Sequence, residues 1–138
     1  MPIKQINRLL LWLQNQSMPK NKIFSGKLGE NIACNYLKNK GYQILARNFR
    51  TRWGELDIIA TYKNKLIFIE VKTRKSADFG SPFEAVTSGK LHRLQRAALF
   101  FNSVHPELPQ TLQIDVIGVI LNQQNQITNI EHRENVTS

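Results

Sequence analysis

The chain is poor in the residues that cross-link small proteins or bind soft metals. It has one cysteine, Cys34, and three histidines among 138 residues. A single cysteine cannot form an intramolecular disulfide, and the histidine spacing does not fit a structural zinc site. We therefore expect a protein of a reducing, cytoplasmic compartment that is stabilised by its apolar core, with Cys34 as a buried member of that core.

Long hydrophobic runs are also missing. The longest run near the N-terminus covers residues 9–13, which is too short for a membrane span, and no signal-peptide cleavage site follows it. We expect no membrane partner. Residues 1–22 combine an amphipathic stretch with a polar linker and are predicted to form an N-terminal appendage, while residues 23–138 are predicted to form one domain. The appendage has three candidate docking surfaces, namely the domain, a partner or an anionic lipid surface. We favour docking on protein over binding to lipid, because the two cations of its amphipathic stretch are a weak membrane signal.

Acidic residues are scarce. The chain has 10 Asp and Glu against 19 Lys and Arg, which gives a formal net charge of +9 and a pI near 10.0. Such a surplus of positive charge is typical of proteins that bind polyanions, most often nucleic acids, although basic proteins can also use it only for solubility. The hydrophobic fraction of 41% is that of an ordinary globular domain and excludes wholesale disorder.

Hydrophobic periodicity and turn residues predict an α/β domain. A helix is expected from Ser25 to a stop at Gly41, and a second helix is expected to begin after a cap at Thr87 or Ser88. A loop with glycine and proline covers 73–83. The predicted strands are 42–49, 54–62, 66–72, 112–121 and 126–131. The order α-β-β-β-α-β-β implies a mixed sheet flanked by helices, because the third strand reaches the fourth through the second helix.

Acidic residues inside apolar strands are the strongest functional signal. Glu55 and Asp57 lie in the second predicted strand, and Glu70 lies in the third, two residues before Lys72. A two-residue turn at 63–64 sets a hairpin register that pairs Asp57 with Glu70. Strand alternation then places Glu70 and Lys72 on one face.

Two opposed carboxylates repel each other unless a cation lies between them. Mg²⁺ or Mn²⁺ can lie between the two carboxylates, since hard cations prefer carboxylate and phosphate oxygens as ligands. Lys72 can hold a nucleophilic water molecule beside them. Glu30, at the border of the apolar arc of the first helix, is a further candidate acid. The alternative is a solvated sheet face with a simple Glu70–Lys72 charge pair. The apolar residues on both faces of 66–71 favour a covered strand instead.

These residues form a recognisable pattern. Asp57, followed by Glu70-x-Lys72 and preceded by the helical Glu30, resembles the PD-(D/E)xK nuclease superfamily, particularly archaeal Holliday-junction resolvases. The motifs look more closely like those of the YraN-like bacterial group, uncharacterised protein family 0102, over about 27–119. They are Gly29-Glu30-x-x-Ala33, Asn48-Phe49-Arg50, Gly54-Glu55-Leu56-Asp57-Ile58-Ile59-Ala60, Phe68-x-Glu70-Val71-Lys72-x-Arg74 and Ala85-Val86-Thr87.

The resemblance implies a restriction-endonuclease-like core and a division of roles. Asp57, Glu70 and the Val71 carbonyl would be metal ligands, Lys72 the catalytic lysine and Glu30 an accessory acid. One departure is Gly54-Glu55, which stands where the superfamily pattern has a proline before the aspartate.

Basic side chains cluster around the predicted site. The cations expected to contact phosphates are Arg47, Arg50, Arg52, Arg74, Lys75, Lys90 and Arg93. The leading hypothesis is a Mg²⁺- or Mn²⁺-dependent endonuclease acting on DNA, branched or otherwise structured, in repair or recombination. The alternative is a nucleic-acid-binding module with weak or no catalysis on the same fold, and RNA is an open substrate class. Symmetric cutting of a junction would require a homodimer.

Overall fold

A computed structural model of the chain describes residues 22–76 and 80–137. The predicted appendage therefore lies outside the described residues except for Lys22, and its boundary stays a prediction. The elements are α2 (Lys22–Asn39), β1 (Gln43–Thr51), β2 (Gly54–Tyr62), β3 (Lys65–Arg74), the 3-10 helix η2 (Pro82–Ala85), α3 (Ser88–Ser103), β4 (Leu112–Leu121) and β5 (Ile127–Arg133).

The five strands form one mixed sheet in the order β1-β2-β3-β4-β5. All neighbours are antiparallel except β3 and β4, which are parallel because the chain crosses over through α3 between them. The α/β fold and the element order predicted from the sequence are thus confirmed. The strands β1 and β3 extend a few residues beyond their predicted ends, and the expected loop of 73–83 contains the start of η2.

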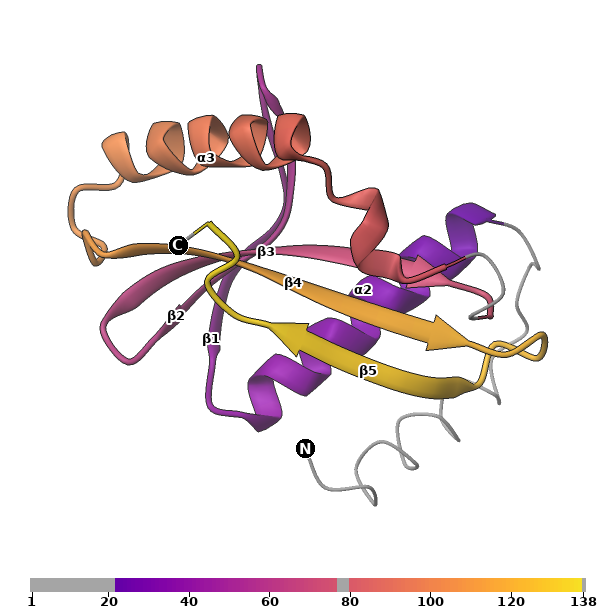
Figure 1. The fold of residues 1–138 in the computed structure, drawn as a ribbon. Coiled ribbons are helices and arrows are strands. Elements are labelled where there is room, and N and C mark those ends of the chain that lie inside the picture. The colour runs from indigo at the N-terminus through magenta and orange to yellow at the C-terminus, as the bar shows by residue number, and fades with distance from the viewer. Residues whose placement is uncertain (1–21, 77–79, 138) are drawn as a thin grey trace.

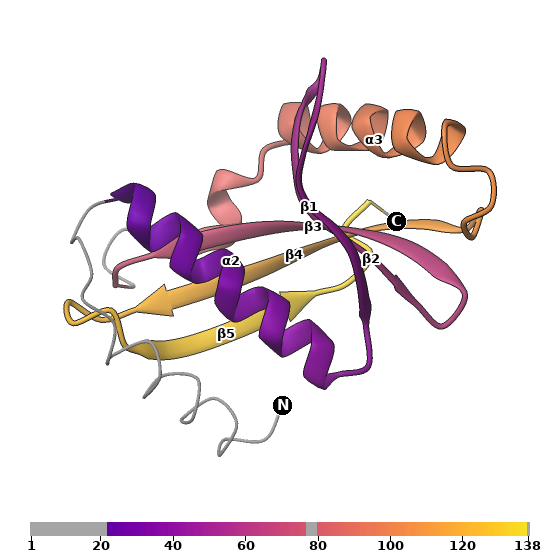
Figure 2. The same cartoon turned by 180° about the vertical axis from the view of Figure 1, so that it is seen from behind.

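The two helices cover opposite faces of the sheet (Figures 1 and 2). Alternation along β3 decides which side chain meets which helix. Ile67 and Ile69 pack in the core beneath α2, whereas Leu66 and Phe68 pack in the core beneath α3. The same alternation places Glu70, the next residue but one after Phe68, on the α3 face.

Local sequence explains where the helices begin and end. In α2, the buried residues Leu28, Ile32 and Leu37 recur at helical spacing. Gly41, with φ +97°, ends this helix, because the left-handed conformation costs glycine little. The α3 helix is capped by Thr87, whose hydroxyl accepts the backbone N–H of Lys90 at 3.2 Å.

A glycine lets α2 approach the sheet closely. A Cβ atom at Gly29 would overlap the side chain of Thr73 on β3. The neighbouring residue, Glu30, is therefore held near the point where β3 leaves its partner β2. Neither described helix is long and apolar enough to cross a membrane, and Cys34 is buried as a free thiol in the core beneath α2.

Candidate functional site

The strands β2 and β3 separate at Asp57. Their regular pairing runs from Tyr62↔Lys65 to Ile58↔Ile69 in the register that the two-residue turn predicts. It stops one step before the predicted Asp57–Glu70 pair, which does not form. Beyond it, β2 stays paired with β1 as far as Thr51↔Gly54, and the β1–β2 hairpin rises away from the rest of the sheet (Figure 1). At the fork, Asp57 Oδ2 accepts the backbone N–H of Val71 at 2.9 Å. The Asp57 carboxylate thus accepts a backbone N–H group of β3 just beyond Ile58↔Ile69, the last pair of the two strands.

Three acidic side chains gather on the α2 side of this fork. One carboxylate oxygen each of Glu30, Glu55 and Asp57 lie within 4.8 Å of one another. Asn48, whose backbone is left-handed with φ 53°, stands over two of them. With its amide nitrogen toward the acids, it donates to Glu30 Oε2 at 3.0 Å and to Glu55 Oε1 at 2.8 Å. The hairpin and α2 together therefore build a compact carboxylate cluster.

Two lysines meet the fourth acid, Glu70, which is only 4% exposed. Its Oε1 lies 2.8 Å from Lys90 Nζ and 3.4 Å from Lys72 Nζ. Lys72 lies two residues further along β3, and Lys90 comes from the first turn of α3. The buried negative charge of Glu70 is therefore neutralised from two elements of the fold.

Electrostatics link Asp57 to both groups. Burial, and then the negative charge of Glu70, raise the pKa of Asp57 to about 7 from its usual 3.8, against the hydrogen bond from Val71. Burial also raises the pKa of Glu30, and this rise is opposed by Arg47 and reinforced by Glu55. Burial and the neighbouring carboxylates thus both favour the protonated forms of Asp57 and Glu30.

The two lysines differ in how firmly they hold their protons. Burial and the contact with Lys90 lower the pKa of Lys72. Burial also acts against the charged form of Lys90, but the hydrogen bonds to Glu70 and Lys72 and the charges of Glu70 and Asp57 outweigh it, so the pKa of Lys90 is raised. Lys90 therefore stays protonated more readily than Lys72, which loses its proton more easily.

The donor set fits a hard divalent cation. The atoms that converge at the fork are carboxylate oxygens from Glu30, Glu55 and Asp57, with no imidazole or thiolate among them. Mg²⁺ and Mn²⁺ prefer such oxygen ligands, while zinc and copper sites favour nitrogen and sulfur. A divalent cation would also offset the charge that raises the pKa of Asp57.

The predicted site residues thus fall into two adjoining groups. Glu30 and Asp57 lie in the carboxylate cluster, Glu70 and Lys72 lie in the lysine group, and Val71 connects them through its N–H. Sequence reasoning did not assign Asn48 to the site and gave no role to Glu55. It placed Lys90 among the phosphate contacts, whereas the structure joins it to Glu70.

The predicted phosphate-binding arginines on β1 adjoin the carboxylate cluster. Arg47 Nη2 lies 3.9 Å from Glu30 Oε2, and Arg50 Nε lies 3.7 Å from Glu55 Oε2. Arg52, at the turn of the hairpin, is exposed. These side chains form a positive rim on one side of the fork.

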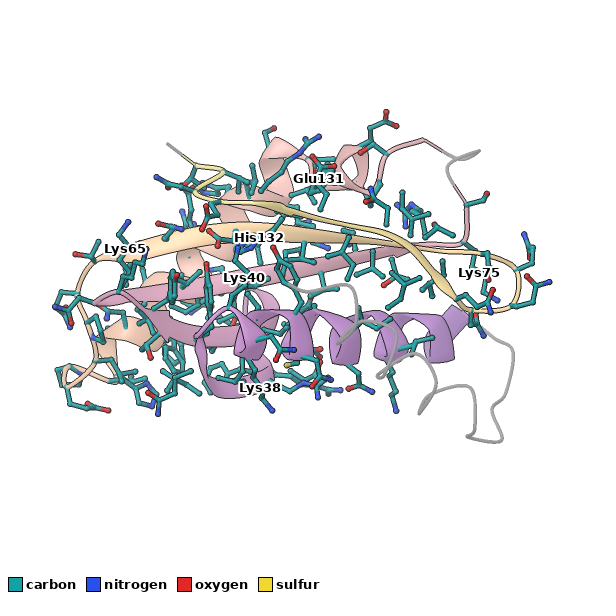
Figure 3. All side chains as sticks on the ribbon, turned by 90° about the horizontal axis from the view of Figure 1, so that it is seen from below. Lys38, Lys40, Lys65, Lys75, Glu131 and His132 are labelled. Atoms are coloured by element: carbon teal, nitrogen blue, oxygen red, sulfur yellow. The ribbon has the colours of Figure 1, made fainter. Side chains whose placement is uncertain are left out.

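The remaining predicted cations lie on β3 and α3. Arg74 ends β3 and donates to the Thr73 carbonyl at 3.2 Å, and Lys75 follows it at one end of the molecule (Figure 3). Arg93 is exposed on α3, one turn after Lys90.

A second polar cluster lies at the other end of α2. The fully buried Asp115 on β4 binds His132 Nε2 at 2.7 Å through Oδ2, and its Oδ1 accepts from Gln113 Nε2 and from the Asn135 N–H, each at 2.9 Å. Lys40 Nζ lies 3.4 Å from His132 Nδ1 (Figure 3). An ammonium can only donate, so we assign the imidazole proton to Nε2. Both ring nitrogens are satisfied, and the cluster fastens the C-terminal segment to β4.

Comparison with known proteins places the chain in one family. Residues 29–119 match the uncharacterised protein family UPF0102. A UPF0102 protein of Syntrophomonas wolfei is 44% identical over 96 residues, which cover 70% of this chain and 84% of the relative. One from Caldicellulosiruptor saccharolyticus is 43% identical, with 80% and 93% covered, and one from Clostridium botulinum is 48% identical, with 72% and 82% covered. The matched region contains the carboxylate cluster, Glu70 and both lysines. The chain therefore belongs to the UPF0102 family.

Proposed function

We propose that the protein is a Mg²⁺- or Mn²⁺-dependent endonuclease of the PD-(D/E)xK type that acts on DNA, branched or otherwise structured, in cytoplasmic repair or recombination. One observation carries the proposal. A strand fork brings an acidic cluster with a hard-cation donor set next to a buried glutamate that two lysines contact. Metal-dependent phosphodiester hydrolysis needs these two elements, a site for the cation and positive groups for the phosphate.

Each side chain has a role in this proposal. By the resemblance, Asp57, Glu70 and the Val71 carbonyl would hold the metal and Glu30 would assist as an accessory acid, with Glu55 beside them in the carboxylate cluster. When bound, the metal polarises the phosphate and acidifies a water molecule. Lys72, with its lowered pKa, orients that water and stabilises the negative charge that builds on the phosphate.

The surroundings favour a nucleic acid as the substrate. The net charge of +9 gives the molecule a strong attraction for polyanions. The exposed side chains of Arg50, Arg52 and Arg93 stand on the hairpin and on α3, the two elements that flank the fork. Such contacts position a phosphate backbone and do not read its sequence.

The test is a cleavage assay on labelled single-stranded, duplex, flapped and four-way DNA, with Mg²⁺, Mn²⁺ or EDTA. We expect divalent-dependent cleavage that falls by about 10² or more in Asp57→Ala, Glu70→Ala and Lys72→Ala. Glu131→Gln, at an exposed position of β5, is the matched control and should cleave like the parent chain.

Two outcomes would overturn the proposal. Cleavage that persists unchanged in all three variants would come from a contaminating nuclease. Salt-sensitive DNA binding without divalent-dependent cleavage of any substrate would instead establish the alternative, a binding module on the same fold.

A further inference from the structure

Lys90 holds the shorter of the two ion pairs to Glu70. Its ammonium lies 2.8 Å from Oε1, whereas that of Lys72 lies 3.4 Å from the same oxygen. The side chain of Lys90 is 30% exposed and that of Glu70 is 4% exposed. A partly exposed cation thus covers the solvent side of a buried anion.

A metal bound to Glu70 would weaken the ion pair with Lys90, because both cations would share one carboxylate. A divalent cation on Glu70 would lie within a few ångströms of the Lys90 ammonium, and like charges at that range repel strongly in a partly buried site. Lys90 sits on a flexible four-carbon chain and is the more exposed of the two lysines, so it can swing outward while its backbone stays in the α3 cap.

We propose that Lys90 competes with the divalent cation for Glu70 and thereby sets the metal affinity of the protein without nucleic acid. This inference rests on the proposed metal site. Lys90 is in this sense a positioning residue. It keeps the buried carboxylate neutralised and oriented, and it gives way when the metal binds. A purely structural role makes the opposite prediction, because loss of a group that only holds Glu70 in place would weaken metal binding.

The test is a Mn²⁺ titration of the full chain without nucleic acid, with free Mn²⁺ measured by electron paramagnetic resonance. Lys90→Gln removes the competing charge and should bind Mn²⁺ about tenfold more tightly than the parent chain. Lys90→Arg keeps the charge and should bind like the parent chain. Arg96→Gln removes the same charge from an exposed position on the same helix and should change the affinity by less than about twofold.

The outcomes separate this inference from the proposed function. Unchanged or weaker Mn²⁺ binding by Lys90→Gln, with a parent chain that binds Mn²⁺, would overturn the role of Lys90 and leave the metal site standing. Tightening of equal size in Arg96→Gln would also overturn it, since the effect would then be one of net charge. Absence of Mn²⁺ binding in both the parent chain and Lys90→Gln would overturn the metal site and the inference together.

Discussion

Replacing Asp57 with asparagine should stabilise the folded protein at neutral and alkaline pH when divalent cations are absent. The pKa of Asp57 is about 7 in the folded protein, whereas its usual value is 3.8. Between these values the folded protein binds a proton that the unfolded chain has lost. The free energy of unfolding therefore falls as the pH rises through this window. Asparagine removes this dependence and can still accept the Val71 N–H through its amide oxygen.

The size of the effect follows from the two pKa values. At roughly 1.36 kcal/mol per pKa unit, the difference between about 7 and 3.8 corresponds to about 4 kcal/mol above about pH 8 and to less than about 1 kcal/mol near pH 4. These are upper limits, because the neighbouring side chains relax when the carboxylate ionises. The burial of Asp57 is the main cause of the raised pKa, and the negative charge of Glu70 is the second.

Urea unfolding in EDTA near pH 4 and near pH 8 measures the effect. Asp57→Asn should be about 4 kcal/mol more stable than the parent chain near pH 8 and nearly equal to it near pH 4. Glu107→Gln removes the same charge from an exposed position and serves as the control. If Asp57→Asn were equally or less stable than the parent chain at both pH values, the raised pKa of Asp57 would be refuted.

Three further perturbations test the surface, the packing and the second polar cluster. If about five phosphates are neutralised, a plot of log K for duplex DNA against log salt should have a slope of about −4.5. The double variant Arg50→Ala with Arg52→Ala should reduce this slope to about −2.7, as measured by fluorescence anisotropy. An affinity that does not depend on salt would point to another partner. Gly29→Ala should lower the unfolding free energy by about 1–3 kcal/mol despite the better helix propensity of alanine, because the new Cβ overlaps Thr73. In urea unfolding, Thr73→Ala should recover part of that loss, and equal losses in the single and double variants would contradict the overlap. Asp115→Ala should lower the free energy of unfolding by about 3–5 kcal/mol in the same assay, because three donors lose their buried acceptor. A loss below about 1 kcal/mol would show that the cluster does not fasten the C-terminal segment.

Local sequence rules predicted the fold and the contact between Glu70 and Lys72. The turn at Lys63 and Asn64 fixed the β2–β3 register, and period-two alternation placed Glu70 and Lys72 on one face. Asp57 was found because a carboxylate inside an apolar strand needs a partner. Such signals work because they depend on neighbours within one hairpin.

The rest of the site depends on contacts between distant elements. Lys90 reaches Glu70 only because the crossover sets the start of α3 over β3, and no spacing along the chain encodes that distance. Asn48 turns toward the acids because its backbone is left-handed, which strand alternation does not anticipate. Asp115 carried the same signal as Glu70, an acid within an apolar strand, and was overlooked. Two of its partners, His132 and the Asn135 N–H, come from later in the chain and could not be inferred from β4 alone.

The most direct test of the proposed metal-dependent nuclease activity measures cleavage of a four-way DNA junction and Mn²⁺ binding on the same preparations of the parent chain and of Lys72→Ala. In the proposed function, the carboxylates hold the metal, whereas Lys72 acts on the water and the phosphate. Lys72→Ala should therefore retain Mn²⁺ binding and cleave at least about 10² more slowly than the parent chain. A Lys72→Ala protein that binds Mn²⁺ and cleaves at the parental rate, or a parent chain that binds Mn²⁺ and DNA and cleaves no substrate, would contradict it.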